Sequence, residues 1–181
     1  MGSMTCYLTI IFEQLLAVRY TFSKVFDSTS FVTIDILGEL VEIHLAETAS
    51  EIASCYPVLR ELRPHLTLTD LVEQVQRQMK NYGYVLVYVI AQDQVVAVAG
   101  YRVAEFLAWG RTFYVDDLVT QSDTRKHGYG GALLDWLLQQ AKTLSCNQFH
   151  LDSGVTRHDA HRLYLGRKLQ ISSHHFAVEL G

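Results

Sequence analysis

The sequence predicts an α/β domain, in which strands and helices alternate along most of the chain. A near-continuous apolar run over residues 84–91 is typical of a buried strand. Residues 49–62 carry apolar side chains three and four positions apart, as on one face of a helix. Strand-forming residues over 113–120 give way to a polar turn, a glycine-rich bend and an amphipathic helix that begins near Ala132. Together these patterns favour a sheet packed against helices.

Residues that begin or end helices mark the elements of the first half. Pro64 stops the first helix, because proline has no backbone N–H group and clashes with the preceding turn. Thr69 and Asp70 open a second helix, which runs to about Tyr82 and is capped by Gly83. The elements expected before the bend are a strand, two helices and three strands, over residues 41–45, 49–62, 69–82, 84–91, 95–106 and 113–120.

The elements after the bend continue this alternation. Residues 149–153 are predicted to form a strand, which Gly154 ends. Apolar residues at helical spacing predict a helix over residues 158–169. Residues 171–180 are predicted to form a last strand.

The bend after residue 120 is suited to bind a phosphate group. The first backbone N–H groups of a helix have no partner within the helix, and they lie at the positive end of its dipole. Gly128 and Gly130 lack the Cβ atoms that would block an approaching anion, and they permit unusual backbone angles. Arg125 and Lys126 add positive charge beside the bend. The sequence therefore predicts a ligand that carries phosphate.

The spacing of the glycines excludes two common phosphate motifs. A P-loop would place a Lys-Ser or Lys-Thr pair after the last glycine, whereas Gly131 is followed by Ala132. A dinucleotide-binding fingerprint would need a glycine three residues beyond Gly130, where the chain has Leu133. A nucleotide-binding enzyme with another phosphate ligand stays open as an alternative.

Two motifs resemble those of a known family. Arg125 to Gly130 form the pattern Arg-x-x-Gly-x-Gly, and a second pattern, Ala-x-x-x-Tyr, ends at Tyr164. Both resemble signatures of the GNAT superfamily of N-acetyltransferases, which use acetyl-CoA. Two positions depart from its pattern: Arg157 replaces an asparagine that is often present, and Lys168-Leu169 replaces a Gly-Phe pair.

The resemblance implies a fold and a division of the chain. The GNAT fold has a mixed, largely antiparallel central sheet with helices on both faces. The resemblance covers roughly residues 39–181, which leaves residues 1–38 as an N-terminal extension. Met1-Gly2-Ser3-Met4 looks like a tag scar, and the nature of the element that follows it stays open.

The resemblance also implies how acetyl-CoA is bound. In the family, the strand before the bend separates from its neighbour, and the pantetheine arm inserts there like an additional strand. Leu118, Val119 and Thr120 would then offer backbone hydrogen bonds to the arm and to the thioester oxygen. The implied residues around the pyrophosphate are Arg125, Lys126, His127, Gly128, Tyr129, Gly130 and Gly131.

The same resemblance suggests the catalytic residues. Tyr164 is the expected acid, because a phenol with a pKa near 10 stays protonated at neutral pH; a core tyrosine is the structural alternative. Asp116 and Asp117 are candidate bases, since their strand looks like that of polyamine and small-amine acetyltransferases. Adjacent strand residues face opposite sides, so we expect only one of them to line the cleft, and we favour Asp116. Proton loss directly to water stays open.

The segment that joins the first two helices is a candidate substrate contact. In the family this region borders the acceptor pocket, so Arg63 and His65 are candidates for contact with the amine. A turn that ends a helix and binds no ligand is the equally simple interpretation. The sequence does not identify the acceptor.

Composition limits the other classes of function. The 181 residues fit one domain with a real core. A net charge of −4 argues mildly against nucleic acid as a partner, and no apolar run reaches the ~18–20 residues of a membrane span.

The three cysteines show no paired or metal-like spacing, which favours reduced thiols in the cytoplasm. No metal is expected, because the adjacent His174 and His175 diverge on a strand.

The sequence therefore predicts an acetyl-CoA-dependent N-acetyltransferase. It would transfer an acetyl group to a primary amine of a small molecule or peptide, by direct attack within a ternary complex. A catalytically degenerate acetyl-CoA-binding sensor or interaction module is the alternative. A homodimer stays open, because family members are often dimers.

Overall fold

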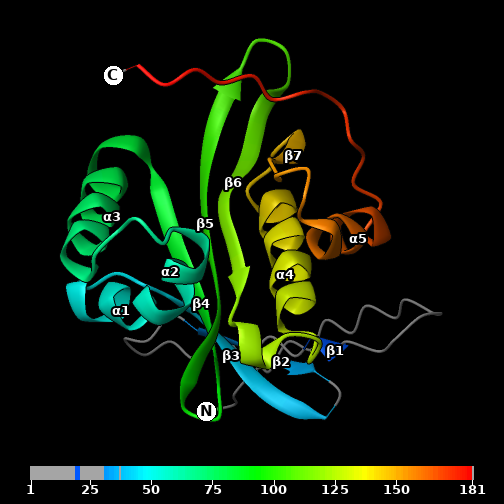
Figure 1. The fold of residues 1–181 in the computed structure, drawn as a ribbon. Helices are drawn as coiled ribbons and strands as arrows, with labels where there is room; N and C mark the ends of the chain where they lie inside the picture. The colour runs from blue at the N-terminus through cyan, green and yellow to red at the C-terminus, as the bar shows by residue number, and fades with distance from the viewer. Residues whose placement is uncertain (1–18, 21–30, 37, 181) are drawn as a thin grey trace, which may run out of the picture.

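A computed structural model describes residues 19–20, 31–36 and 38–180 of the chain (Figure 1). Within these residues, seven strands form one sheet whose spatial order follows the chain. The strands are β1 (Arg19–Tyr20), β2 (Phe31–Ile36), β3 (Glu39–Leu45), β4 (Tyr84–Ala91), β5 (Gln94–Phe106), β6 (Gly110–Thr120) and β7 (Gln148–Leu151). Neighbouring strands are antiparallel except β6 and β7, which are parallel. The sheet is thus mixed and largely antiparallel, as predicted.

Helices cover both faces of this sheet (Figure 1). They are α1 (Ala49–Ser54), α2 (Tyr56–Leu62), α3 (Leu68–Tyr82), α4 (Tyr129–Thr143) and α5 (His158–Gly166). Helices α1, α2 and α3 share one core cluster with Leu86 and Tyr88, whereas α4 shares another with Val87 and Val89. Because β4 is buried on both faces, its sequence is apolar almost throughout.

The N-terminal ends of the helices differ in whether a side chain caps them. Thr48 and Thr67 each form a capping box, at the start of α1 and α3 respectively. These hydroxyl groups accept hydrogen bonds from backbone N–H groups that the helix leaves unpaired. Helix α4 instead has Gly128 at its N-cap, with φ of 93° and no side-chain cap. The backbone N–H groups at this end of α4 are therefore left available for a ligand.

The first predicted helix is divided in two. Residues 49–62 form α1 and α2, which meet at Cys55. Pro57 explains the break, because proline cannot donate a helical hydrogen bond but fits well in the first turn of a new helix. Helix α4 also begins earlier than expected, at Tyr129 rather than near Ala132, since the end of the glycine bend forms its first turn.

The predicted last strand was wrong. No strand forms over residues 171–180, which extend from α5 as an irregular segment (Figure 1). Alternating residues give such a segment strand propensity, but a strand also needs a neighbouring edge to pair with. Lys168 has φ of 63°, and after it the chain leaves α5 without pairing with β7. Phe176 and Val178 consequently remain 89% and 81% exposed.

Part of the predicted N-terminal extension belongs to the sheet. Strand β2 pairs with β3 along its whole length, and Ile34 and Ile36 are buried in the core on the α4 side. Apart from β1 and β2, most of residues 1–38 lies outside the described residues, including the suspected tag scar. The domain boundary at residue 39 stays a prediction.

Candidate functional site

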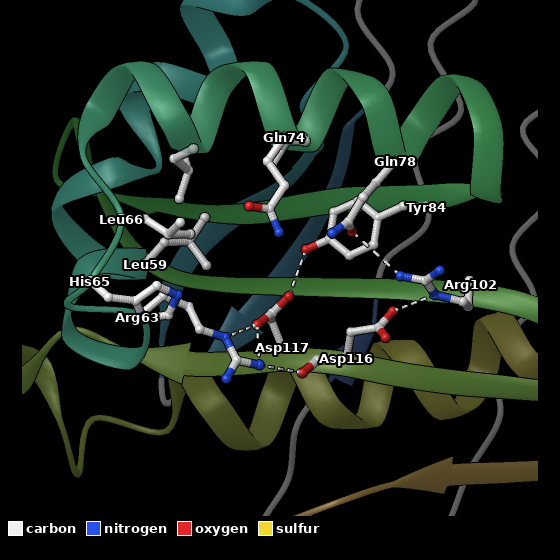
Figure 2. A pocket seen from close by; sticks show the side chains of 12 residues that line it. Leu59, Arg63, His65, Leu66, Gln74, Gln78, Tyr84, Arg102, Asp116 and Asp117 are labelled. Carbon is white, nitrogen blue, oxygen red and sulfur yellow. Dashed lines mark hydrogen bonds and ion pairs between the residues drawn. The ribbon is translucent and has the colours of Figure 1, made fainter. Parts of the chain in front are cut away.

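Strand β6 contains a β-bulge that brings two neighbouring carboxylates to one pocket. Gly100 of β5 pairs with Asp117, whereas Tyr101 pairs with Val115, so Asp116 is an additional residue in the ladder. A bulge of this kind cancels the alternation of side chains between the two faces of a strand. Asp116 and Asp117 both line the pocket (Figure 2). The expectation that only one of them would line the cleft was therefore wrong.

The pocket lies between α2, α3 and the strands β4, β5 and β6 (Figure 2). Its volume is about 310 Å³, which is within the range of small-molecule sites. Arg63 and His65, the two candidates from the segment between the helices, line it. The remaining lining residues besides the two aspartates are Leu59, Leu66, Leu71, Gln74, Val75, Gln78, Tyr84 and Arg102.

Asp117 is held by hydrogen bonds at both carboxylate oxygens. Arg63 Nε donates to Oδ1 at 2.9 Å, and the Tyr84 hydroxyl group donates to Oδ2 at 2.8 Å. Arg63 Nη2 also donates to the backbone oxygen of Asp116 at 3.1 Å. Burial, with the nearby Asp117 carboxylate, raises the pKa of Tyr84 well above its usual value, so Tyr84 stays a hydrogen-bond donor. These bonds make Asp117 a structural centre of the pocket.

Asp116 keeps one carboxylate oxygen without a partner among the described residues. Arg102 Nε donates to Oδ2 at 2.8 Å, while Oδ1 makes no hydrogen bond with any described residue. Burial raises the pKa of the Asp116 carboxyl group, and the neighbouring Arg102 opposes this effect. A carboxylate with a raised pKa and a free oxygen is suited to accept a proton. The geometry therefore favours Asp116 over Asp117 as the base.

The second half of β6 has an open edge. Strand β7 pairs with residues 112–115 only, so residues 116–120 have no described strand on that side. On their other side, Leu118, Val119 and Thr120 pair with β5. An extended chain could add to this edge through backbone hydrogen bonds, as a strand does. The edge is thus suited to hold the pantetheine arm that the resemblance implied.

The glycine bend follows β6 after one short 3-10 turn, Ser122–Thr124. The backbone N–H groups of residues 126–131 donate to no acceptor among the described residues. A Cβ atom on Gly130 would lie 2.7 Å from Thr120 Oγ1, so this position has little room for a side chain. Uncapped N–H groups at the positive end of a helix bind phosphate well. The bend therefore fits the pyrophosphate of acetyl-CoA.

Three side chains of the bend, those of Arg125, His127 and Tyr129, have partners of their own. Arg125 forms an ion pair with Glu61 of α2 at 3.1 Å, and Glu61 also accepts a hydrogen bond from the Ser122 backbone at 3.0 Å. The Tyr129 hydroxyl group donates to Glu39 at 2.9 Å, and His127 Nδ1 lies 3.0 Å from the Thr124 backbone oxygen. The bend would therefore contact phosphate through its backbone more than through these side chains.

Tyr164 lies on α5 and is not among the residues that line the pocket. It is half-buried, and its hydroxyl group makes no hydrogen bond with a described residue. Burial raises the pKa of Tyr164, while Arg157 opposes this effect slightly. The phenol is therefore protonated at neutral pH, as an acid must be. The structure does not bring Tyr164 together with Asp116 in one pocket.

Sequence reasoning missed Tyr84, Arg102 and Gln78. Arg102 was detectable in principle, because it is a lone charge within the apolar part of β5. Tyr84 and Gln78 gave no such signal, since a tyrosine at the start of a strand and a glutamine on a helix are both common. Their role depends on how α3 packs over the sheet.

This fold and site define an acyltransferase that uses acetyl-CoA. The chain belongs to the Acetyltransferase (GNAT) family, whose model matches residues 45–167. It is 30% identical over 124 residues to the uncharacterized N-acetyltransferase YhdJ of Bacillus subtilis (strain 168). The match covers 67% of this chain and 87% of that protein.

Solved structures show the same fold. A transcriptional regulator from Bacillus halodurans C-125 superposes with a TM-score of 0.67 at 19% identity, covering 77% of this chain and 99% of that one. A GNAT family acetyltransferase from Staphylococcus aureus subsp. aureus USA300_TCH1516 gives a TM-score of 0.65 at 19% identity, covering 77% and 98%. At this identity the likeness concerns the fold alone.

No group of three or more His, Cys, Asp or Glu residues in the described part of the chain is arranged to hold a metal ion. Among the helices that the structure describes, none has the length and apolar character needed to cross a membrane.

Proposed function

We propose that this enzyme transfers an acetyl group from acetyl-CoA to a primary amine of a small molecule or peptide, by direct attack in a ternary complex. One observation carries the proposal: strand β6 borders both the pocket that would hold the amine and the open edge that would hold the pantetheine arm. Its bulge presents Asp116 to the pocket. Its open edge continues from the bulge toward the glycine bend. An amine in the pocket and a thioester along the edge would meet beside Asp116.

The cofactor would be held mainly by backbone groups. Residues 118–120 would bind the pantetheine arm, and residues 126–131 would bind the pyrophosphate. Glu61 supports this arrangement, because it joins α2 to both Ser122 and Arg125. Holding the two reactants in contact would supply much of the acceleration, since well-oriented pairs reach effective molarities of about 10⁵ M or more.

The proton transfers can be assigned to residues of this chain. Acetyl-CoA supplies a thioester whose carbonyl carbon is open to attack by nitrogen. Asp116 would accept the proton of the ammonium group through its free oxygen, directly or through water. A backbone N–H group in residues 118–120 would stabilise negative charge on the thioester oxygen. Tyr164 would donate a proton to the departing sulfur, and the second proton that the nitrogen loses would restore the phenol through water.

The cysteines support direct attack over an acyl-enzyme. Burial raises the pKa of the Cys55 thiol to about 12, so it is not a reactive thiolate. Cys55 lies in the core where α1 meets α2, and neither it nor Cys146, the other cysteine in the described part of the chain, lines the pocket. A covalent route would need an activated nucleophile beside a base.

Thermal unfolding with separate ligands tests this proposal. Acetyl-CoA, CoA, NADH and ATP would each be added in excess to the same protein sample. A ligand at ~100 times its dissociation constant stabilises the native state by roughly 2.7 kcal/mol, which gives a measurable shift. We expect a shift with the two CoA species and none with NADH or ATP. A shift with NADH or ATP alone would overturn the proposal.

Turnover separates the enzyme from the degenerate alternative. Protein that binds acetyl-CoA would be incubated with a panel of primary amines, and free thiol would be measured. Thiol release that depends on an amine supports acetyl transfer. Binding without release for every amine class would favour the sensor or interaction module, which Arg157 and Lys168-Leu169 kept open.

A further inference from the structure

The charges that line the pocket balance one another. Asp116 pairs with Arg102 at 2.8 Å, and Asp117 pairs with Arg63 at 2.8 Å. Two carboxylates therefore face two guanidinium groups, all in contact with the same cavity. A polycation would find little net negative charge here, because each carboxylate already has a cationic partner. A ligand that itself carries one positive and one negative group would match this balance.

Unpaired atoms indicate where each group of such a ligand would bind. Asp116 Oδ1 is a free acceptor, and Arg63 Nη1 is a free donor with respect to the described residues. Arg63 is also the more accessible arginine, with a side chain 42% exposed against 27% for Arg102. An arginine presents a planar set of donors that suits a carboxylate.

Arg63 and Asp116 are in contact through the backbone of Asp116. Arg63 Nη2 donates to the backbone oxygen of Asp116 itself, at 3.1 Å. The guanidinium group is therefore next to the residue whose side chain would receive the ammonium group. A ligand that bridges them would carry its amino and carboxylate groups only a few bonds apart. The cavity of about 310 Å³ has room for a molecule of amino-acid size.

We infer that the acceptor is a small zwitterionic amine of the amino-acid type, with its ammonium group at Asp116 and its carboxylate group at Arg63. This inference rests on the proposed function, and it names the substrate class for the same site. Arg63 would select the substrate and position it, whereas Asp116 would take part in the chemistry. His65 and Gln74, which also line the cavity, would contact the variable side chain.

Matched pairs of amines test the inference. L-amino acids would be compared with their carboxamides, with saturating acetyl-CoA and detection of free thiol, and spermidine would represent polyamines. We expect kcat/KM for the amino acids to exceed that for the carboxamides at least tenfold. An amide group lowers the pKa of its amine and leaves more of it free to react, so basicity cannot produce this preference.

Variants of Arg63 give a second readout. Arg63→Gln should raise KM for the amino acid at least tenfold while it changes KM for the carboxamide much less. Arg63→Lys keeps the charge without the planar donors, and it should recover part of the loss. Arg60→Gln is the matched control, because Arg60 lies in the last turn of α2, just before the C-cap residue Arg63, but does not line the pocket.

The outcomes separate this inference from the proposed function. Carboxamides or spermidine acetylated as well as amino acids, or equal effects of Arg63→Gln on both members of a pair, would overturn the inference while acetyl transfer stands. The absence of thiol release with every amine tested, together with no stabilisation by CoA, would overturn the proposed function itself.

Discussion

The hydroxyl group of Tyr84 lies over Gly100, where a Cβ atom would come within 1.8 Å of that oxygen. The two residues are on adjacent strands, and the ring crosses β5 so that its hydroxyl group reaches Asp117 on β6. Glycine at this position therefore allows a buried tyrosine to support the bulge from the opposite strand. The absence of a side chain at Gly100 thus allows Tyr84 on β4 to hold the Asp117 carboxylate on β6, two strands away.

Gly100→Ala should be strongly destabilising. The added methyl group would displace the Tyr84 ring, and overpacking of this kind costs typically about 1–3 kcal/mol. Urea denaturation would measure the loss in the free energy of unfolding. Gly166→Ala is the matched control, because no atom lies within 4 Å of the added Cβ there, and we expect a change within about 0.5 kcal/mol. Equal stability of the two variants would contradict the contact.

The pH profile should report Asp116. A base must be ionised to accept a proton, and burial raises the pKa of this carboxyl group above its usual value of 3.8. We therefore expect kcat/KM to be lost as pH falls through the raised pKa, and to be retained above it. Initial rates across the acid range would show this loss above pH 3.8, provided that the fold is monitored by circular dichroism.

Asp116→Asn should remove the proposed base, and with it the loss of kcat/KM at low pH, which is the acid limb of the pH profile. General bases contribute about 10²–10⁴-fold, so kcat should fall by that order while binding of acetyl-CoA is retained. Asp117→Asn serves as the comparison: it should alter the pocket and KM but keep the acid limb. An unchanged pH profile in Asp116→Asn would mean that water or Asp117, rather than Asp116, accepts the proton.

Gly130→Asp should abolish binding of acetyl-CoA. The variant places a carboxylate at the first turn of α4, where the proposed ligand carries phosphate, and the two negative charges would repel each other. Gly130→Ala has the same Cβ atom, which meets Thr120 Oγ1 at 2.7 Å, but no charge. Calorimetric titration should show weakened binding for alanine and none for aspartate. Comparable affinity in both variants would place the phosphate elsewhere.

The local pattern of the sequence was sufficient for most of the fold. The strand over residues 84–91 and the helix that Gly83 ends were both confirmed, because burial and capping leave periodic signals within a few residues. The segment over residues 171–180 has similar local character and forms no strand. Whether a strand forms there depends on a partner edge, which a local pattern does not contain.

The site depended on relationships between strands. The bulge at Asp116 follows from the register of β5 against β6, and no residue in the sequence of β6 predicts it. The pairing of Arg102 with Asp116 depends on the same register, because the two residues are separated by a hairpin. Single motifs, such as the glycine bend, could be predicted, since their chemistry is local. For the catalytic base, the sequence offered Asp116 and Asp117, favoured Asp116, and left proton loss to water open.

Tyr164→Phe tests the remaining catalytic assignment. Loss of the hydroxyl group removes the proposed acid but leaves the ring in place, so kcat should fall about 10²-fold or more while acetyl-CoA stabilises the protein as before. Tyr82→Phe is the matched control, because Tyr82 is 65% exposed and does not line the pocket. Steady-state rates at neutral pH would decide. Full activity of Tyr164→Phe would show that this tyrosine is a packing residue and that the thiolate leaves with a proton from water. That result would agree with the position of Tyr164 outside the acceptor pocket, so this variant is the sharpest test of the acid.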